Sequence, residues 1–310
     1  MELYPLKFRP IQLPKIWGKE TWILSAYGQY KSQVINGYLA GNELDELVEV
    51  YMGELIGDSL FERFGGQFPL LLKIIDASDD LSVQVHPDDD YAIEHNQSLG
   101  KSEMWYVLSA EKDAEIILGL KDGVSSENVI QSLEQGNLTD YLNHLHVREG
   151  DVAFIPAGTV HTLRAGVRVA EIQQASDVTY RLYDYNRRDS EGQLRQLHIK
   201  DALNVIDFDN QQKTLVPYTQ VQNGAANLLQ NELFTANLLC FNQPIGRDYA
   251  PLDSFVAYIL TEGDLLLEQG GNKVSMSQGE CVLIPASADE VMLYPQNKQI
   301  KLLEVYVCEN

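Results

Sequence analysis

The feature that most constrains the fold of this chain is the segment of residues 81–107, in which two alternating runs flank a polar stretch. Polar and apolar residues alternate over residues 82–86, so a strand there would place Gln84 and His86 on one face and two valines on the other. Pro87 and the three aspartates after it end this run. The pattern predicts a short strand that presents two potential ligand side chains in the same direction.

The second alternating run covers residues 101–107 and predicts a strand with a carboxylate on its polar face. That face would carry Lys101, Glu103 and Trp105. If the two strands pair, the side chains of Gln84, His86 and Glu103 could converge on one cation. Imidazole and carboxylate together suit zinc or another first-row divalent metal.

His161 is the expected source of a fourth ligand. It follows residues 150–160, where glycine and proline at both ends predict a turn, a short buried strand and a second tight turn. The predicted ligand set is therefore Gln84, His86, Glu103 and His161.

Four motifs of the chain resemble those of the type I mannose-6-phosphate isomerases, which are cupin-fold zinc enzymes. They are SVQVHPDD at residues 82–89, GKSEMWYVL at 100–108, IPAGTVH at 155–161 and EIQQASDVTYRLYDYNRRD at 171–189. The resemblance extends from about residue 5 to residue 206. It is to the compact bacterial form, which lacks a large separate helical domain.

The resemblance implies a function and roles for individual residues. It implies that mannose 6-phosphate and fructose 6-phosphate are interconverted through an enediol, with one Zn²⁺ per chain bound by the four side chains named above. Lys101, Glu171 and Arg181 match active-site positions of the family. Lys101 and Glu171 are expected to serve proton transfer and hydroxyl positioning. Arg181 is expected to stabilise enediolate charge or to hold the phosphate, so Lys101 and Arg181 are the predicted substrate-binding residues.

A weak internal repeat indicates a second β-sandwich in the C-terminal part. Residues 279–290 align without gaps on residues 150–161, and residues 257–260 are similar to residues 105–108. The repeat implies two units of one design. Because the second copy has Glu290 in place of the histidine and no counterpart of the Gln-Val-His run, it is expected to bind no metal.

The predicted fold class is mainly β, with two cupin or jelly-roll β-sandwich domains and a helical insertion in the first. The insertion, at residues 125–145, predicts a helix, a glycine break and a second helix. Apolar residues at helical spacing predict another helix over residues 41–64. The catalytic metal-binding domain is expected at residues 1–210, and a smaller jelly roll without a metal site at residues 225–310.

The net charge excludes some classes of binding partner, and the cysteines indicate the redox state of the compartment. A net charge of −22 argues against nucleic acid or an anionic membrane as the main partner, so an anionic substrate would need a local basic site. Cys240, Cys281 and Cys308 form no close-spaced metal pair and cannot all be disulfide-bonded within one chain, which fits a reducing compartment. No stretch approaches the ~20 apolar residues of a membrane span. The chain is expected to be cytoplasmic, as a monomer or a homodimer.

Two other functions fit the same pattern. A cupin dioxygenase that uses iron would also employ histidine and carboxylate ligands, although a glutamine ligand and a nearby lysine argue against it. A sugar-phosphate-binding cupin without turnover would require a broken site, whereas every matched position is intact here. Metal content and oxygen uptake would discriminate between the isomerase and the dioxygenase.

Overall fold

The computed structural model describes residues 2–188 and 192–308. Residue contacts divide the chain into two compact units, one of residues 1–11, 22–71 and 217–310 and the other of residues 12–21 and 72–216. This division groups residues 22–71 with the C-terminal strands, whereas the predicted first domain runs continuously from 1 to 210. Among the described residues, no helix reaches the length and apolarity that crossing a membrane requires.

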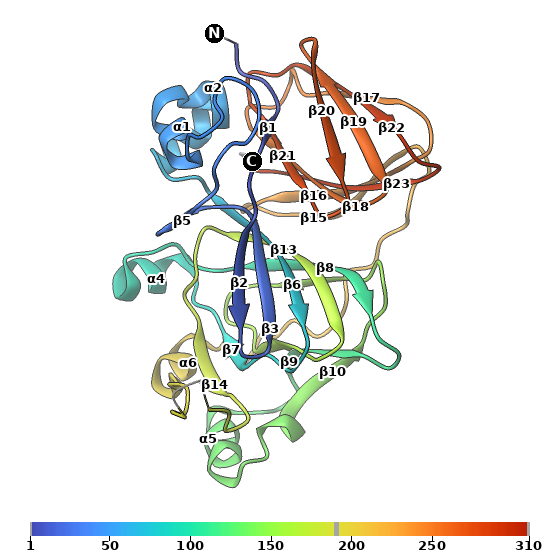
Figure 1. Ribbon diagram of the computed structural model, residues 1–310. Helices are drawn as coiled ribbons and strands as arrows, with labels where there is room; N and C mark the ends of the chain where they lie inside the picture. Colours follow the sequence, from blue (N-terminus) through green and yellow to red (C-terminus); the bar gives the residue numbers. More distant parts are fainter. Residues whose placement is uncertain (1, 189–191, 309–310) are drawn as a thin grey trace. The chain divides into compact units, whose positions relative to one another are not determined.

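The unit of residues 72–216 contains most of two β-sheets (Figure 1). The six-stranded sheet has the order β11 (Val152–Ile155), β8 (Glu103–Ala110), β13 (Val167–Gln174), β6 (Leu70–Ala77), β3 (Gly18–Leu24) and β2 (Ile11–Lys15). The five-stranded sheet has the order β10 (Leu142–His146), β9 (Glu115–Leu120), β12 (His161–Leu163), β7 (Val83–Val85) and β14 (Tyr180–Tyr183). Both strands predicted from residues 81–107 therefore form, but in different sheets.

Alternation along the strands builds an apolar layer between these two sheets. Trp105 and Val107 of β8 pack in one buried cluster with Ile116 and Leu118 of β9. The outer face of the five-stranded sheet has a second cluster, in which Val83 and Val85 of β7 and Ile117 of β9 are joined by residues of two helices. Since the valines of β7 pack on the outer side, the side chain of Gln84 between them is directed to the inner side.

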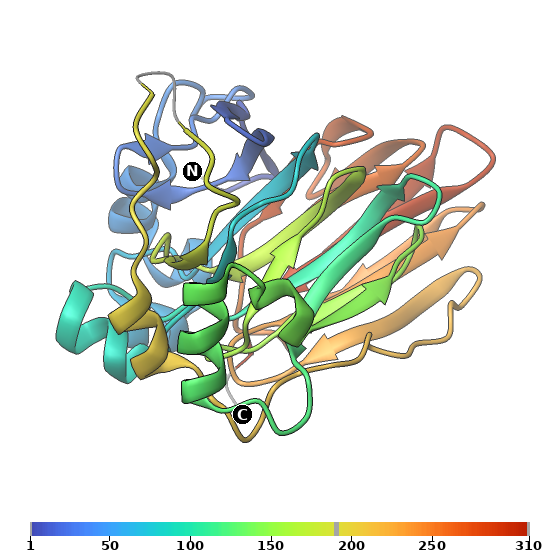
Figure 2. The same cartoon turned by 90° about the horizontal axis from the view of Figure 1, so that it is seen from below.

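The helices of this unit are α4 (Asp89–Asn96), α5 (Ser126–Gln135), the short 3₁₀ helix η1 (Leu138–Tyr141) and α6 (Ile199–Val205). Figure 2 shows α5 in green beside α6 in gold, and both contribute to the outer apolar cluster. The Ser125 side chain caps α5 by accepting a hydrogen bond from the Asn128 amide, and Gly136 ends it in a left-handed conformation.

One local prediction in this unit is wrong, and one helix was not predicted. The second helix expected within residues 125–145 is a single 3₁₀ turn followed by β10, because residues 142–146 pair with β9 and extend the sheet. The acidic run after Pro87 begins a helix that was not predicted. Asp88 accepts a hydrogen bond from the Tyr91 amide and begins α4.

The other unit is a second sandwich, in which five neighbouring strands of the larger sheet follow the chain order of β11, β8, β13, β6 and β3. That sheet has the order β1 (Leu6–Lys7), β21 (Cys281–Ile284), β18 (Val256–Glu262), β23 (Ile300–Tyr306), β16 (Thr235–Phe241) and β15 (Gly224–Gln230). The smaller sheet has the order β17 (Ile245–Asp248), β22 (Glu290–Pro295), β19 (Asp264–Gln269) and β20 (Asn272–Ser277). The predicted fold class, mainly β with two sandwiches and a helical insertion, is confirmed.

Three further features belong to this second unit. The predicted helix over residues 41–64 is divided into α1 (Leu44–Tyr51), α2 (Gly53–Ile56) and α3 (Asp58–Phe64), because Met52 and Gly57 adopt positive φ angles of 48° and 102°. A hairpin of β4 (Ala26–Tyr27) and β5 (Tyr30–Lys31) precedes these helices. All three cysteines are free thiols in this unit; Cys240 and Cys281 are buried, and Cys308 is half-buried.

Candidate metal centre and active-site pocket

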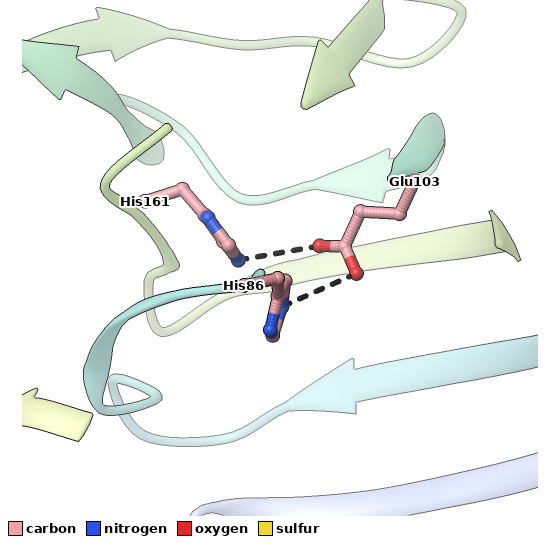
Figure 3. Close-up of side chains that lie close together, drawn as sticks. All are labelled: His86, Glu103 and His161. Carbon is pink, nitrogen blue, oxygen red and sulfur yellow. Dashed lines mark ion pairs between the residues drawn. The ribbon is translucent and has the colours of Figure 1, made fainter. Parts of the chain in front are cut away.

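Three of the four predicted metal ligands form one buried cluster. The Glu103 carboxylate lies between two imidazoles, with Oε1 3.3 Å from His161 Nε2 and Oε2 3.5 Å from His86 Nε2 (Figure 3). One potential ligand atom from each of the three residues lies within 4.8 Å of those of the others. The side chains are no more than 1% exposed, so water does not solvate these polar atoms.

The strands explain why these side chains meet. Glu103 is the first residue of β8, His161 is the first residue of β12, and His86 directly follows β7. Residue 161 pairs with residue 84 across the β12–β7 ladder. Consequently two strands of the five-stranded sheet provide the imidazoles, and the opposite sheet provides the carboxylate.

Gln84, the fourth predicted ligand, lies at the edge of this cluster. Its side-chain Nε2 is 3.3 Å from His161 Nε2. Because the two ends of an amide have nearly the same shape, a rotation of the amide group would place its carbonyl oxygen at the same position. The side chain is therefore within reach of an ion that contacts the other three residues.

Both histidines are oriented through Nδ1. His86 Nδ1 lies 2.9 Å from the Val178 carbonyl oxygen, and His161 Nδ1 lies 2.9 Å from that of Thr159. A carbonyl oxygen only accepts, so each Nδ1 carries a hydrogen, and Nε2 is the atom with the lone pair in the neutral form of each ring. This second interaction of the ring is typical of metal-ligating histidines.

The charges favour the ligand forms of these groups. Burial, followed by the nearby Lys101 ammonium, holds the pKa of His86 well below its ordinary value. Burial acts in the opposite direction on Glu103, but Lys101 at 3.0 Å and the two imidazoles hold the pKa of this carboxyl well below its ordinary value. Near neutral pH the cluster thus contains neutral imidazole at His86 and an ionised carboxylate.

The cluster leaves several buried atoms without hydrogen bonds. Among the described residues, His86 Nε2 and both oxygens of Glu103 have no hydrogen-bond partner, and Oε2 has an ion pair with Lys101. Lone pairs on Nε2 and on the carboxylate oxygens face one another, and a cation between them would convert mutual repulsion into attraction. Donors about 2.0–2.1 Å from a tetrahedral ion would be about 3.3–3.4 Å apart, and the distances here are 3.3 and 3.5 Å. The residues fit a divalent metal.

A polar pocket borders the cluster. Gln84 and Lys101 belong to its lining, and both also contact members of the cluster. The full lining comprises Lys15, Trp17, Glu20, Lys73, Ile75, Leu81, Ser82, Gln84, Lys101, Trp105, Glu171, Asp177, Thr179, Arg181 and Arg195. The structure therefore brings all three predicted active-site residues, Lys101, Glu171 and Arg181, to one pocket beside the candidate metal ligands.

Glu171 is held by two neighbours within the six-stranded sheet. Trp105 Nε1 donates a hydrogen bond to Glu171 Oε2 at 2.9 Å, and Lys73 Nζ lies 3.1 Å from Oε1. Lys73 is 2% exposed, and although burial acts to lower its pKa, Glu171 and Glu20 raise it above its ordinary value. The sequence reasoning missed Lys73. Its signal was a single lysine within the otherwise apolar run of residues 70–75.

Comparison with known proteins places these features in a family. Residues 14–122 match the model of the phosphomannose isomerase type I catalytic domain. The mannose-6-phosphate isomerase ManA of Bacillus subtilis strain 168 is 34% identical over 322 residues, which cover 94% of this chain and 96% of that protein. The chain belongs to the type I phosphomannose isomerase family. The predicted resemblance is confirmed.

Other members of the phosphomannose isomerases agree with this assignment. A mannose-6-phosphate isomerase of Streptococcus mutans is 44% identical over 187 residues, covering 60% of this chain and 57% of that protein. The crystal structure of the Bacillus subtilis enzyme superposes with a TM-score of 0.88 at 29% identity, covering 98% of this chain and 100% of that one. A phosphomannose isomerase variant from Salmonella typhimurium, at 15% identity and a TM-score of 0.80, shares the fold.

Proposed function

We propose that this member of the type I phosphomannose isomerases interconverts mannose 6-phosphate and fructose 6-phosphate with a single Zn²⁺ held by Gln84, His86, Glu103 and His161. The relatives reported above support the reaction. The observation that carries the metal assignment is the buried set of lone-pair atoms on His86 and Glu103 without hydrogen-bond partners.

The ligand set also suits the chemistry. Two neutral imidazoles, one amide and one carboxylate leave zinc with a net charge near +1, so that, when bound, it polarises a sugar hydroxyl or carbonyl oxygen as a Lewis acid. The reaction moves a proton between neighbouring carbons through an enediol and requires no redox cofactor. Burial of the cluster limits access of water to the reacting end of the sugar.

The proton-handling roles are assigned to Lys101 and Glu171. Lys101, fixed by its ion pair with Glu103 at 3.0 Å, presents an ammonium group that can donate to a sugar oxygen. Glu171 and Glu20 are buried pocket carboxylates outside the proposed ligand set, and Glu171 is the one that matches a family active-site position. Trp105 and Lys73 fix its orientation. We assign proton transfer to Glu171 and hydroxyl positioning to Lys101.

Arg181 is assigned to a negative charge of the reacting sugar, that of the enediolate or that of the phosphate. It lies on β14 directly across the ladder from Gln84 and lines the pocket. Its guanidinium remains charged and can donate several hydrogen bonds in a fixed plane. An anion that develops beside the proposed ligand Gln84 would therefore find a donor on the adjacent strand.

The decisive experiment measures conversion of mannose 6-phosphate to fructose 6-phosphate by the purified protein, after chelation and after addition of zinc. We expect activity to disappear with the chelator and to return with about one equivalent of zinc. His161→Ala and Glu103→Ala should behave like the metal-free protein and lose at least about a thousandfold in kcat/KM. His146→Ala, a change at an exposed histidine, is the matched control and should retain activity.

Metal content and thermal stability provide readouts that do not depend on turnover. Zinc should raise the Tm of the unchanged protein and of His146→Ala, but not of Glu103→Ala. Full turnover in either ligand variant would refute the ligand assignment. Full turnover in chelated protein would refute metal dependence, and substrate-dependent oxygen uptake would support the dioxygenase instead.

A further inference from the structure

Two arginines line the active-site pocket, and sequence reasoning identified only one of them. Arg181 extends from β14, and Arg195 comes from the segment before α6. Arg195 is largely buried, with 22% of its side chain exposed. Two guanidinium groups in one pocket are notable in a chain whose net charge is −22.

Arg181 has unused capacity to donate hydrogen bonds. Its Nε is buried and has no hydrogen-bond partner among the described residues. Burial, followed by the positive charge of Arg195, lowers the pKa of Arg181 from its ordinary value. A half-buried cation beside a second cation, with a buried donor atom unpaired, is an arrangement that a bound anion would stabilise.

Asp184 holds the second arginine in place. Its carboxylate is 4% exposed and accepts from Arg195 Nη1 at 3.2 Å to Oδ1 and 3.4 Å to Oδ2. The same carboxylate binds Arg187 Nη2 at 2.5 Å. Asp184 thus divides one negative charge between two arginines, and Arg195 donates to it through only one of its nitrogens.

The lysines of the pocket are already paired. Lys73 lies 3.1 Å from Glu171, Lys101 lies 3.0 Å from Glu103, and Lys15 lies 3.5 Å from Glu20. An incoming anion would therefore compete with a carboxylate at each lysine. At Arg181 no carboxylate of the described residues is within ion-pair distance, and at Arg195 the carboxylate is shared.

We propose that Arg181 and Arg195 form a clamp for the phosphate group of the substrate, with Asp184 as a positioning residue that orients Arg195. This proposal rests on the proposed function, because it assigns the phosphate of mannose 6-phosphate to the arginine end of the pocket. The sugar then extends toward Gln84, which lines the pocket and contacts His161 of the metal cluster. Arginine suits this role because its planar fork matches phosphate oxygens.

The test uses the intact zinc-loaded protein and three substitutions. Arg195→Gln removes the charge, Arg195→Lys keeps the charge without the fork, and Asp184→Asn releases Arg195 from its anchor. Arg148→Gln removes an arginine that is 90% exposed and lies outside the pocket lining, and it serves as the matched control. The measurements are kcat and KM for mannose 6-phosphate, inhibition by inorganic phosphate, and binding of inorganic phosphate by ³¹P NMR.

We expect Arg195→Gln to raise both the KM and the inhibition constant of inorganic phosphate by roughly 10- to 100-fold, with kcat changed much less. Arg195→Lys should recover part of this loss. Asp184→Asn should raise the same two constants by a smaller factor, because the charge of Arg195 remains. Zinc content and Tm should stay near those of the unchanged protein in Arg195→Lys and in the control.

The outcomes separate this proposal from the proposed function. Values of KM and of the phosphate inhibition constant within about twofold of the unchanged protein in Arg195→Gln would overturn the clamp, as would a loss confined to kcat. If the unchanged protein does not isomerise mannose 6-phosphate but binds inorganic phosphate, and Arg195→Gln does not, the clamp stands and the activity assignment fails. If the unchanged protein isomerises the substrate, and Arg195→Gln binds inorganic phosphate as tightly as the unchanged protein does, only the clamp fails.

Discussion

The imidazole of His86 is enclosed on all sides, with Nδ1 bound to the Val178 carbonyl and Nε2 directed at Glu103. Burial and Lys101 disfavour its protonated form. In the unfolded chain the same ring takes up a proton near its ordinary pKa of 6.5. Between these two pKa values the unfolded state binds more protons than the folded state, so lowering the pH favours unfolding.

The free energy of unfolding of the metal-free protein should therefore be highest above pH 6.5 and decrease as the pH falls below it. Urea unfolding at pH 7.5, 6.5 and 5.5, with a chelator present, measures this dependence. His86→Gln should show a weaker dependence over the same interval, because the titrating ring is absent. Parallel curves for the two proteins would contradict the assignment to His86.

At the level of single residues, the sequence predicted side chains whose direction follows from alternation. Gln84 and His86 point inward because the two valines of β7 are needed in the outer apolar cluster. Lys73 and Arg195 were not predicted, because no local pattern shows that a lone lysine in β6 meets Glu171, or that an arginine in a loop returns to the pocket. Such partners are distant in sequence and meet only in the folded chain.

At the level of elements, the connection between β7 and β8 sets the spacing of the metal cluster. The Lys101 amide donates to the Pro87 carbonyl at 2.9 Å, and the Gly100 amide donates to Asp89 Oδ1 at 2.7 Å. A Cβ atom on Gly100 would lie 2.4 Å from the Asp88 carbonyl carbon and 2.5 Å from the Asp89 nitrogen. The loop therefore closes on itself only with glycine at this position.

Gly100→Ala should lower the free energy of unfolding by about 1–3 kcal/mol and weaken zinc binding, because the backbone at Asp88 must move away. Chemical denaturation and a competitive zinc titration measure the two effects. Gly66→Ala is the control, since its Cβ would approach only the flexible Glu49 side chain, at 3.3 Å. Equal stabilities of the two variants would show that the loop accommodates the methyl group.

The sequence revealed the internal repeat but did not fully determine how the residues of the two copies correspond. Across the larger sheets, one ladder row reads Ala153, Trp105 and Glu171, and the corresponding row of the other unit reads Val282, Tyr258 and Glu304. Ala153 and Val282 correspond in the ungapped alignment of the sequence as well. The sequence alignment also placed Ala257 on Trp105, whereas in the structure Tyr258 takes the place of Trp105. A one-residue slip between short apolar runs leaves little trace in sequence, although it exchanges the two faces of a strand.

The same row carries a carboxylate in both units, with different partners. Glu171 is bound by Trp105 and Lys73 beside the pocket. Glu304 is completely buried and accepts hydrogen bonds from Arg247 Nε at 2.8 Å and from Arg247 Nη2 at 3.0 Å. Both carboxylates are therefore paired with a cation of their own unit, and the two cations, Lys73 and Arg247, lie outside the repeated motif.

At the scale of the whole molecule, composition and motifs predicted two sandwiches, but not which N-terminal segments accompany each one. Residues 22–71 group with the C-terminal strands, although they precede the first metal-ligand motif by only a few residues. The cause is packing. Apolar side chains of this segment, such as Phe68 against Phe255, find their partners far along the chain.

The distribution of thiols has a practical consequence at this scale. All three cysteines belong to one unit, and burial raises the pKa of Cys240 to about 11 and that of Cys281 well above its ordinary value. An alkylating reagent should therefore modify the folded protein at Cys308 and reach the other two only when that unit opens. Mass spectrometry counts the added groups, and rapid addition of three groups under native conditions would contradict this expectation.

The unit of residues 12–21 and 72–216 contains no cysteine and two of the three tryptophans, Trp17 and Trp105, whereas Trp22 lies in the unit with the cysteines. Alkylation therefore reports on one unit, and fluorescence reports mainly on the other. The natural sequence thus contains two independent probes of its own unfolding. Comparing the rates from the two probes would show whether the two units unfold together or one after the other, and no engineered label is needed.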